Sequence, residues 1–158
     1  MTPRIALYHP EIPQNVGTII RTCACFDVPL DIIYPIGFVW DEKRIKRSHM
    51  DYITHTQIQK HDNLTNFITT HKNKPMIILS SNAETSLFDY QLPDNPIFVF
   101  GREGDGIESK DEQIFLDHPE SRIMKIPILG RSLNLAVCVG TVLGIIAYQK
   151  SRIFHRSL

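Results

Sequence analysis

Short apolar runs of four or five residues alternate along this chain with segments whose apolar residues recur at helical spacing. The runs are apolar at consecutive positions, which is typical of parallel strands covered on both faces. Strands of this kind alternating with helices predict the α/β class, with a mainly parallel sheet and helices on both faces. The expected strands are Ile5–Tyr8, Leu30–Tyr34, Met76–Leu79, Ile97–Phe100 and Ile123–Ile126.

Helical patterns fill the intervals between these runs. Asn15 is expected to cap the first helix, which reaches Phe26. Ser109 and Glu112 fit a capping box at the start of another helix. The expected helices span residues 15–26, 41–49, 62–71, 109–116 and about 132–152.

The last predicted helix is apolar almost all round, so most of its surface needs a cover. Ala136, Gly140, Gly144 and Ala147 place small residues near one stripe, where another backbone can approach closely. Two covers fit this pattern equally well: the sheet of the same chain, or a second subunit of a homodimer. The stretch Leu133–Tyr148 is shorter than the roughly 18–20 residues that span a bilayer, so we expect no membrane helix.

Composition limits the functions that remain. In 158 residues, 17 Lys plus Arg balance 17 Asp plus Glu, so a nucleic-acid site has to be a local patch. The three cysteines lack disulfide or zinc spacing, and the first residues lack a signal-peptide pattern. We therefore expect one reduced, cytoplasmic domain over residues 1–158. We expect no metal site, and surface positions for His49, His55, His61 and His71.

The segment after the first strand carries Asn15 and Arg21, six residues apart. Ligands of parallel α/β sheets bind at the carboxyl ends of the strands, where this segment begins. A guanidinium there can bind a phosphate or an oxyanion in fork geometry. On spacing alone, a helix cap and a surface ion-pair arginine are the favoured interpretation.

The segment Phe100-Gly-Arg-Glu-Gly-Asp-Gly-Ile107 follows another strand. Its three glycines predict a positive φ or a close backbone approach. Their spacing matches neither the dinucleotide fingerprint nor the P-loop. Glu103 and Asp105 would repel a phosphate, so an uncharged or cationic ligand fits better than a nucleotide phosphate. A tight turn without a ligand is the alternative.

Two more segments carry polar groups of interest. Pro127 and Gly130 bend the chain before the last helix, where Ser132 is a possible cap. Asn134 is expected to be buried and to hydrogen-bond a neighbouring loop or a ligand. Elsewhere, four cations at 43, 44, 46 and 47 can neutralise phosphates or form a solvated helix face.

Taken in order, these motifs resemble the SPOUT class of knotted methyltransferases, and within it the tRNA (cytidine(34)-2'-O)-methyltransferase family, TrmL. The resemblance covers nearly the whole chain, through Ile5–Arg21, Pro35–Arg44, Phe100–Ile107 and the Ile126–Leu135 segment with its Ser-Leu-Asn-Leu. It implies a deep C-terminal trefoil knot, a homodimer and S-adenosyl-L-methionine as cofactor. The implied reaction methylates the ribose 2'-hydroxyl of the wobble nucleotide of tRNA, cytidine or uridine, and releases S-adenosyl-L-homocysteine.

The resemblance also implies roles for single residues. The family's catalytic arginine corresponds to Arg21, with Asn15, Glu103 and Asn134 as companions. The cofactor contacts, largely through backbone groups, correspond to Leu79, Gly101, Ile126 and Ser132. Apart from the resemblance, we expect tRNA binding to be largely electrostatic, with both subunits contributing Lys43, Arg44, Lys46, Arg47 and Arg131.

Other functions remain open at this point. A non-catalytic RNA-binding or assembly module of the same fold would bind RNA without binding the cofactor. Methylation of another RNA site is a second alternative. An unrelated nucleotide-binding α/β protein is disfavoured, because neither phosphate-binding fingerprint is present.

Overall fold

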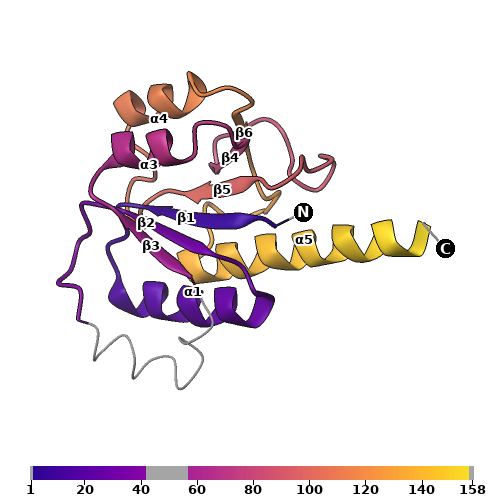
Figure 1. Cartoon of the computed structure of the whole chain (residues 1–158), viewed down its shortest axis with the longest axis horizontal. Helices are drawn as coiled ribbons and strands as arrows, with labels where there is room; N and C mark the ends of the chain where they lie inside the picture. Colours follow the sequence, from indigo (N-terminus) through magenta and orange to yellow (C-terminus); the bar gives the residue numbers. More distant parts are fainter. Residues whose placement is uncertain (1, 42–56, 157–158) are drawn as a thin grey trace.

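The computed structural model describes residues 2–41 and 57–156 (Figure 1). The predicted helix at 41–49 lies outside these ranges from residue 42 onward. Strands and helices alternate through the rest of the chain, as predicted. The strands are β1 (Arg4–Tyr8), β2 (Leu30–Ile33), β3 (Ile58–His61), β4 (Met76–Leu79), β5 (Ile97–Phe100) and β6 (Arg122–Met124). The helices are α1 (Pro13–Phe26), α3 (Leu64–Thr70), α4 (Ser109–Leu116) and α5 (Leu135–Arg156).

Within the described ranges the strands form one sheet in the order β3-β2-β1-β5-β4-β6, and all neighbouring strands are parallel. The α/β class, the parallel sheet and the five predicted strands are confirmed, with small shifts at their ends. The sequence does not predict β3, an edge strand with exposed Gln59 and Lys60. Its only apolar residue is Ile58, so it lacks the continuous apolar run of a buried strand.

Helices cover both faces of this sheet (Figure 1). On one face, α1 and α5 share a core with strand residues that include Ile5 and Phe98. On the other face, Phe67 of α3 and Phe115 of α4 pack in a second core. Because both faces are covered, β2 and β5 are buried along their whole lengths. This double burial explains the continuous apolar runs in the sequence.

The first turns of α1 and α4 differ from the predicted caps. α1 begins at Pro13, whose fixed φ suits a first helical position, so Asn15 is the third residue of the helix and not its cap. α4 follows Glu108, and Ser109 is its first helical residue. The predicted capping box between Ser109 and Glu112 is therefore wrong.

α5 begins at Leu135, later than predicted, and Ser132 does not cap it. Asn134 takes that role: its Oδ1 accepts the N–H groups of Ala136 at 2.9 Å and Val137 at 3.3 Å. Short polar side chains satisfy the first amides of a helix in this way, but here the side chain is that of Asn134 and the predicted cap Ser132 is wrong. The start of α5 is thereby fixed beside the carboxyl ends of the strands.

After β6, at the outer edge of the sheet, the chain crosses to the face opposite α4 and enters α5, which packs along α1 (Figure 1). α5 buries Val139 and Leu143 in the core of that face, whereas Val137 and Tyr148 are 54% and 61% exposed. The sheet face and α1 therefore cover only one side of the helix. None of the helices in the described ranges is long and apolar enough to cross a membrane.

Candidate active site at the carboxyl ends of the strands

Three loops converge where the parallel strands end. The loop after β1 leads into α1, the glycine-rich loop follows β5, and the segment after β6 leads into α5 (Figure 1). These are the three segments that the sequence singled out. Their meeting point is the edge at which open parallel sheets bind ligands.

The glycine-rich loop is a tight, closed turn. The N–H of Arg102 donates to the carbonyl of Gly106, and the N–H of Gly106 donates to the carbonyl of Arg102, both at 3.2 Å. A Cβ on Gly101 would lie 2.6 Å from the backbone of Gly106, and Gly106 itself has φ of 74°. The predicted close approach and positive φ are both confirmed, and they explain why glycine is required at these two positions.

Two glutamates tie this loop to the start of α1. Glu103 accepts the N–H of Glu11 at 2.8 Å, the N–H of Ile12 at 3.3 Å and the side-chain amide of Asn15 at 3.0 Å. In return, Glu11 accepts the N–H of Gly104 at 3.0 Å. The Glu103 carboxylate thus satisfies amides at the positive end of α1 from a distant loop.

Asn15 extends this network to the third loop. The amide of Asn134 donates to the side-chain oxygen of Asn15 at 3.0 Å, while its own oxygen caps α5. Asn134 is exposed and not buried as predicted, but the expected bond to a neighbouring loop is confirmed. We call the linked side chains Asn134, Asn15 and Glu103 the amide chain. Three of the four predicted catalytic residues therefore belong to one network.

Arg21, the fourth predicted catalytic residue, lies further along α1. Its six-residue separation from Asn15 corresponds to about 9 Å along the helix axis. Its side chain is exposed, as the sequence predicts for a surface arginine. The helix that carries Arg21 is the one whose first turn is held by Glu103.

The predicted cofactor residues sit on three neighbouring strand ends. Leu79 is the last residue of β4 and pairs in register with Phe100 of β5 and Met124 of β6. Gly101 follows β5, and Ile126 lies two residues after β6. Leu79, Gly101 and Ile126 therefore lie at the carboxyl ends of three neighbouring strands.

A pocket of about 310 Å³ opens beside these strand ends. Of the four predicted cofactor residues, Ile126 lines it, and Arg131, a predicted RNA contact, lines it as well. Leu79, Gly101 and Ser132 are not among the lining residues. The lining residues are Ser81, Lys125, Ile126, Pro127, Ile128, Leu129, Gly130 and Arg131.

A polar group that the sequence did not predict lies at the end of β1. The hydroxyl of Tyr8 donates to the carboxylate of Asp111 in the first turn of α4. The His9 ring stacks on Tyr8 with centroids 3.7 Å apart. Burial lowers the pKa of His9, although the charges of Asp111 and Glu108 oppose that change. Tyr8 and Asp111 are far apart in sequence, so no local pattern predicts their contact.

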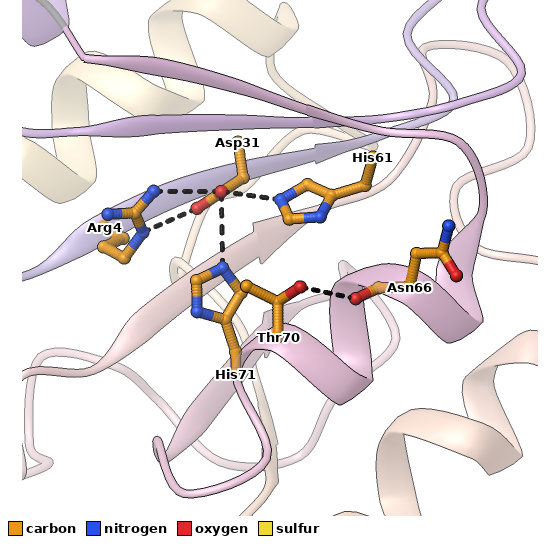
Figure 2. Close-up of polar contacts among 6 residues, drawn as sticks. All are labelled: Arg4, Asp31, His61, Asn66, Thr70 and His71. Carbon is orange, nitrogen blue, oxygen red and sulfur yellow. Dashed lines mark hydrogen bonds and ion pairs between the residues drawn. The ribbon is translucent and has the colours of Figure 1, made fainter.

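A second polar cluster lies away from this edge, between β1, β2, β3 and the end of α3 (Figure 2). Arg4 holds both carboxylate oxygens of the buried Asp31, with Nε–Oδ2 at 2.7 Å and Nη2–Oδ1 at 2.9 Å. The Nε2 atoms of His61 and His71 lie 2.8 and 3.3 Å from the same Oδ1. Both histidines are at most 5% exposed, so their predicted surface positions are wrong; His49 and His55 lie outside the described residues.

The charge of this Asp31 cluster is balanced inside the chain. Burial opposes ionisation of Asp31, but hydrogen bonds from His71, Arg4 and His61 outweigh it and hold the pKa of the carboxyl well below its usual range. The spacing of Asp31, His61 and His71 is close enough for a metal ion. Arg4, however, already supplies the positive charge that the carboxylate needs, so we assign the cluster to the core.

The fold and these motifs define the class of the protein. The chain belongs to the SpoU rRNA Methylase family, whose model matches residues 2–144. Membership of this family implies the C-terminal knot that the sequence resemblance predicted. The crystal structure of the SpoU methyltransferase AviRb from Streptomyces viridochromogenes, in complex with the cofactor AdoMet, shares the fold with a TM-score of 0.80 at 18% identity, over 94% of this chain and 58% of that one.

Within the family, two relatives and one solved structure that are similar to this chain carry names that specify the RNA position. The tRNA (cytidine(34)-2'-O)-methyltransferase of Escherichia coli strain K12 is 33% identical over 141 residues, covering 87% of each chain. The enzyme of the same name from Beijerinckia indica is 32% identical over 142 residues, covering 89% of this chain and 87% of its own. A structure solved to explain 2-OH methylation of C/U34 on tRNA is 34% identical, with a TM-score of 0.82 over 96% of this chain and 97% of that one.

Proposed function

We propose that this chain, as a single domain over residues 1–158, methylates the 2'-hydroxyl of the wobble nucleotide of tRNA, a cytidine or a uridine derivative. The observation that carries the proposal is the amide chain. Asn15, Glu103 and Asn134 come from three distant motifs and meet at the carboxyl edge of the sheet. Relatives that are 32–33% identical over most of this chain are named for this reaction.

The residues at the strand ends fit S-adenosyl-L-methionine. The pocket of about 310 Å³ is within the size range of small-molecule sites, and Ile126, Pro127 and Ile128 give it apolar walls. Gly101 leaves no room for a side chain because the backbone of Gly106 lies against it, so the loop turns tightly at the end of β5, next to the proposed cofactor position. Glu103 and Asp105 nearby favour a cationic sulfonium over a phosphate. Leu79, Gly101, Ile126 and Ser132 would hold the cofactor, which supplies an electrophilic methyl group.

Arg21 is the proposed catalytic residue. In the reaction a bond forms between the ribose 2'-oxygen and the methyl carbon, the carbon–sulfur bond breaks, and the hydroxyl proton leaves. A guanidinium is a poor general base in proteins, so Arg21 is not assigned the role of accepting that proton. Arg21 instead orients the hydroxyl or the adjacent phosphate and stabilises the developing negative charge on the oxygen. A neighbouring tRNA phosphate takes the proton.

Asn15, Glu103 and Asn134 act as positioning residues in this proposal. Each of them already bonds another part of the site: Glu103 bonds the start of α1, and Asn134 caps α5. They keep α1, and with it Arg21, in a fixed relation to the cofactor loops. Alignment of a weak nucleophile with its electrophile supplies much of the rate of such a transfer.

The partners follow from surfaces of the chain. Val137 and Tyr148 expose apolar area on α5, and a second copy of this chain, packed there in a homodimer, is the proposed cover. Lys43, Arg44, Lys46 and Arg47 are proposed to bind tRNA phosphates, although they lie outside the described residues. Arg131, exposed at the pocket, joins them.

The test is methyl transfer by the purified protein. Transcribed tRNA, incubated with S-adenosylmethionine and digested by a base-specific ribonuclease, is expected to carry one 2'-O-methyl group in the fragment that contains position 34, located by tandem mass spectrometry. Calorimetry with S-adenosylmethionine alone is expected to show binding. RNA binding without cofactor binding would replace this proposal with a non-catalytic RNA-binding module, and methylation elsewhere would correct the target.

A further inference from the structure

Two partly exposed aromatic side chains, Phe38 and Trp40, lie in the segment that follows β2. The rings of Phe38 and Trp40 have centroids 6.3 Å apart and an interplanar angle of 24°. Both pack against the core of the α1 and α5 face but stay partly exposed, and Val39 between them is 91% exposed. This pair therefore caps the core and at the same time belongs to the surface.

A cation lies on one of these rings. The Nζ atom of Lys60, from the edge strand β3, is 4.1 Å from the centroid of the Trp40 ring. This is a cation–π contact, and Lys60 itself is exposed. Proteins bind single-stranded nucleic acid with this combination, because bases stack on aromatic rings while a nearby cation pairs with the backbone phosphate.

Backbone packing fixes this aromatic surface beside the candidate active site. Gly37 donates its N–H to the carbonyl of Pro10 at 2.9 Å, and a Cβ on Gly37 would lie 2.8 Å from the Cα of Glu11. Glu11 in turn donates its N–H to Glu103 of the amide chain. In Figure 1 this segment leaves the carboxyl end of β2 and runs past the start of α1. Gly37 and Glu11 thus connect the aromatic surface to Glu103 of the amide chain.

Resting on the proposed function, we propose that Phe38, Trp40 and Lys60 bind a nucleotide that flanks the methylated one in the anticodon loop. The flanking base stacks on the aromatic pair, and the ammonium group of Lys60 pairs with a phosphate of the same strand. The contact holds the single strand while the target ribose reaches the site. The electrostatic RNA contacts predicted from the sequence include neither of these rings.

Trp40 is the only tryptophan of the chain, so intrinsic fluorescence reports directly on this surface. The full-length protein is titrated with an anticodon stem-loop RNA while tryptophan emission is recorded. In parallel, the anisotropy of a dye on the RNA measures binding. We expect saturable quenching of Trp40 with the same midpoint as the anisotropy curve. RNA binding that leaves the emission unchanged would overturn the proposal.

Variants measure the contribution of each side chain. Trp40→Leu and Phe38→Leu are expected to raise KM for tRNA by about tenfold with a smaller change in kcat, because stacking contributes to binding of the strand. Trp40→Phe keeps an aromatic face and is expected to retain most of the affinity. Lys60→Ala is expected to weaken binding and flatten its salt dependence, whereas Lys72→Ala, an exposed lysine after α3, is the matched control.

Failure of this inference is separable from failure of the proposed function. If the wild type methylates position 34 but Trp40→Leu, folded by its melting curve, binds tRNA like the wild type, the aromatic surface has no RNA role and the function stands. If the Lys72→Ala control loses as much affinity as Lys60→Ala, the loss reflects the lower positive charge of the whole protein and not a contact of Lys60, and the proposal is overturned. If the wild type transfers no methyl group, the proposed function itself fails.

Discussion

The Asp31 cluster and the amide chain both join segments that are far apart in the sequence, but they do so with opposite chemistry. Asp31 is fully buried and ionised, and Arg4, His61 and His71 surround its carboxylate. The amide chain lies at the edge of the sheet and consists of neutral amides plus one carboxylate that bonds backbone N–H groups. Breaking a buried charge leaves a partner without compensation, whereas the exposed amide of Asn134 can exchange its bond to Asn15 for one with water or a ligand. The first arrangement suits the core, and the second suits a site.

The largest expected effect is on stability. Asp31→Asn removes the charge that balances Arg4 and is expected to lower the free energy of unfolding by about 3–5 kcal/mol. Chemical denaturation measures this change, with Asp89→Asn, at an exposed aspartate, as control. The molecules that stay folded are expected to keep their turnover. An Asp31→Asn variant that keeps its stability but loses its activity would show that the Asp31 cluster belongs to the site and not to the core.

Arg21→Ala is expected to reduce kcat by about 10²–10³-fold, because developing charge on the 2'-oxygen loses its stabilising group. The melting temperature and the affinity for S-adenosylmethionine are expected to stay close to the wild-type values. Single-turnover assays and calorimetry measure these quantities. Arg21→Lys keeps the charge without the planar fork and tests whether geometry matters. Wild-type turnover in Arg21→Ala would remove this residue from the mechanism.

Neutralising Lys43, Arg44, Lys46 and Arg47 together is expected to weaken tRNA binding and to flatten its dependence on salt. Each lost phosphate contact lowers the slope of log affinity against log salt concentration by about 0.7–0.9. Binding measured at several salt concentrations gives this slope. If the slope of the fourfold variant equals that of the wild type, the basic run makes no phosphate contact.

Glu103→Gln is expected to cost about tenfold in kcat, because charge-assisted bonds to the start of α1 become neutral ones and the alignment of the site loosens. The effect on stability should be small, since these groups are near the surface. Glu84→Gln, at an exposed glutamate, is the matched control. A loss of stability comparable with that of Asp31→Asn would show that both clusters belong to the core.

The smallest expected effect is a pH dependence confined to the Asp31 cluster. The folded-state pKa of Asp31 lies below its usual value of 3.8, so its contribution to stability is complete above about pH 5 and is lost as the pH falls through and below 4. The difference in unfolding free energy between the wild type and Asp31→Asn should therefore shrink in acid. Denaturation at several pH values between 7 and 3 tests this, and a constant difference would contradict it.

The sequence alone predicts those features of the fold that depend on neighbouring residues in the chain. Continuous apolar runs identify five of the strands, and glycine spacing identifies the tight turn at Gly101. It fails where the cause is a distant partner. The histidines at 61 and 71 look like surface residues because their polar neighbours are exposed, and only the fold brings them to Asp31.

Helix boundaries fail for a related reason. Asn15 has the chemistry of a cap, but Pro13 starts the helix earlier and frees the Asn15 side chain to bond Glu103 and Asn134. The edge strand β3 lacks an apolar run because one side of it has no neighbouring strand among the described residues. The motifs of the candidate site could be located from the sequence, whereas the way they bond one another could not.

The link between Asn15 and Asn134 has a consequence for biosynthesis. Asn15 leaves the ribosome early, but its partner is 119 positions later in the chain. A nascent chain that lacks the start of α5 has neither the third loop nor the amide that holds it. Activity therefore requires that α5 has emerged from the ribosome and docked along α1.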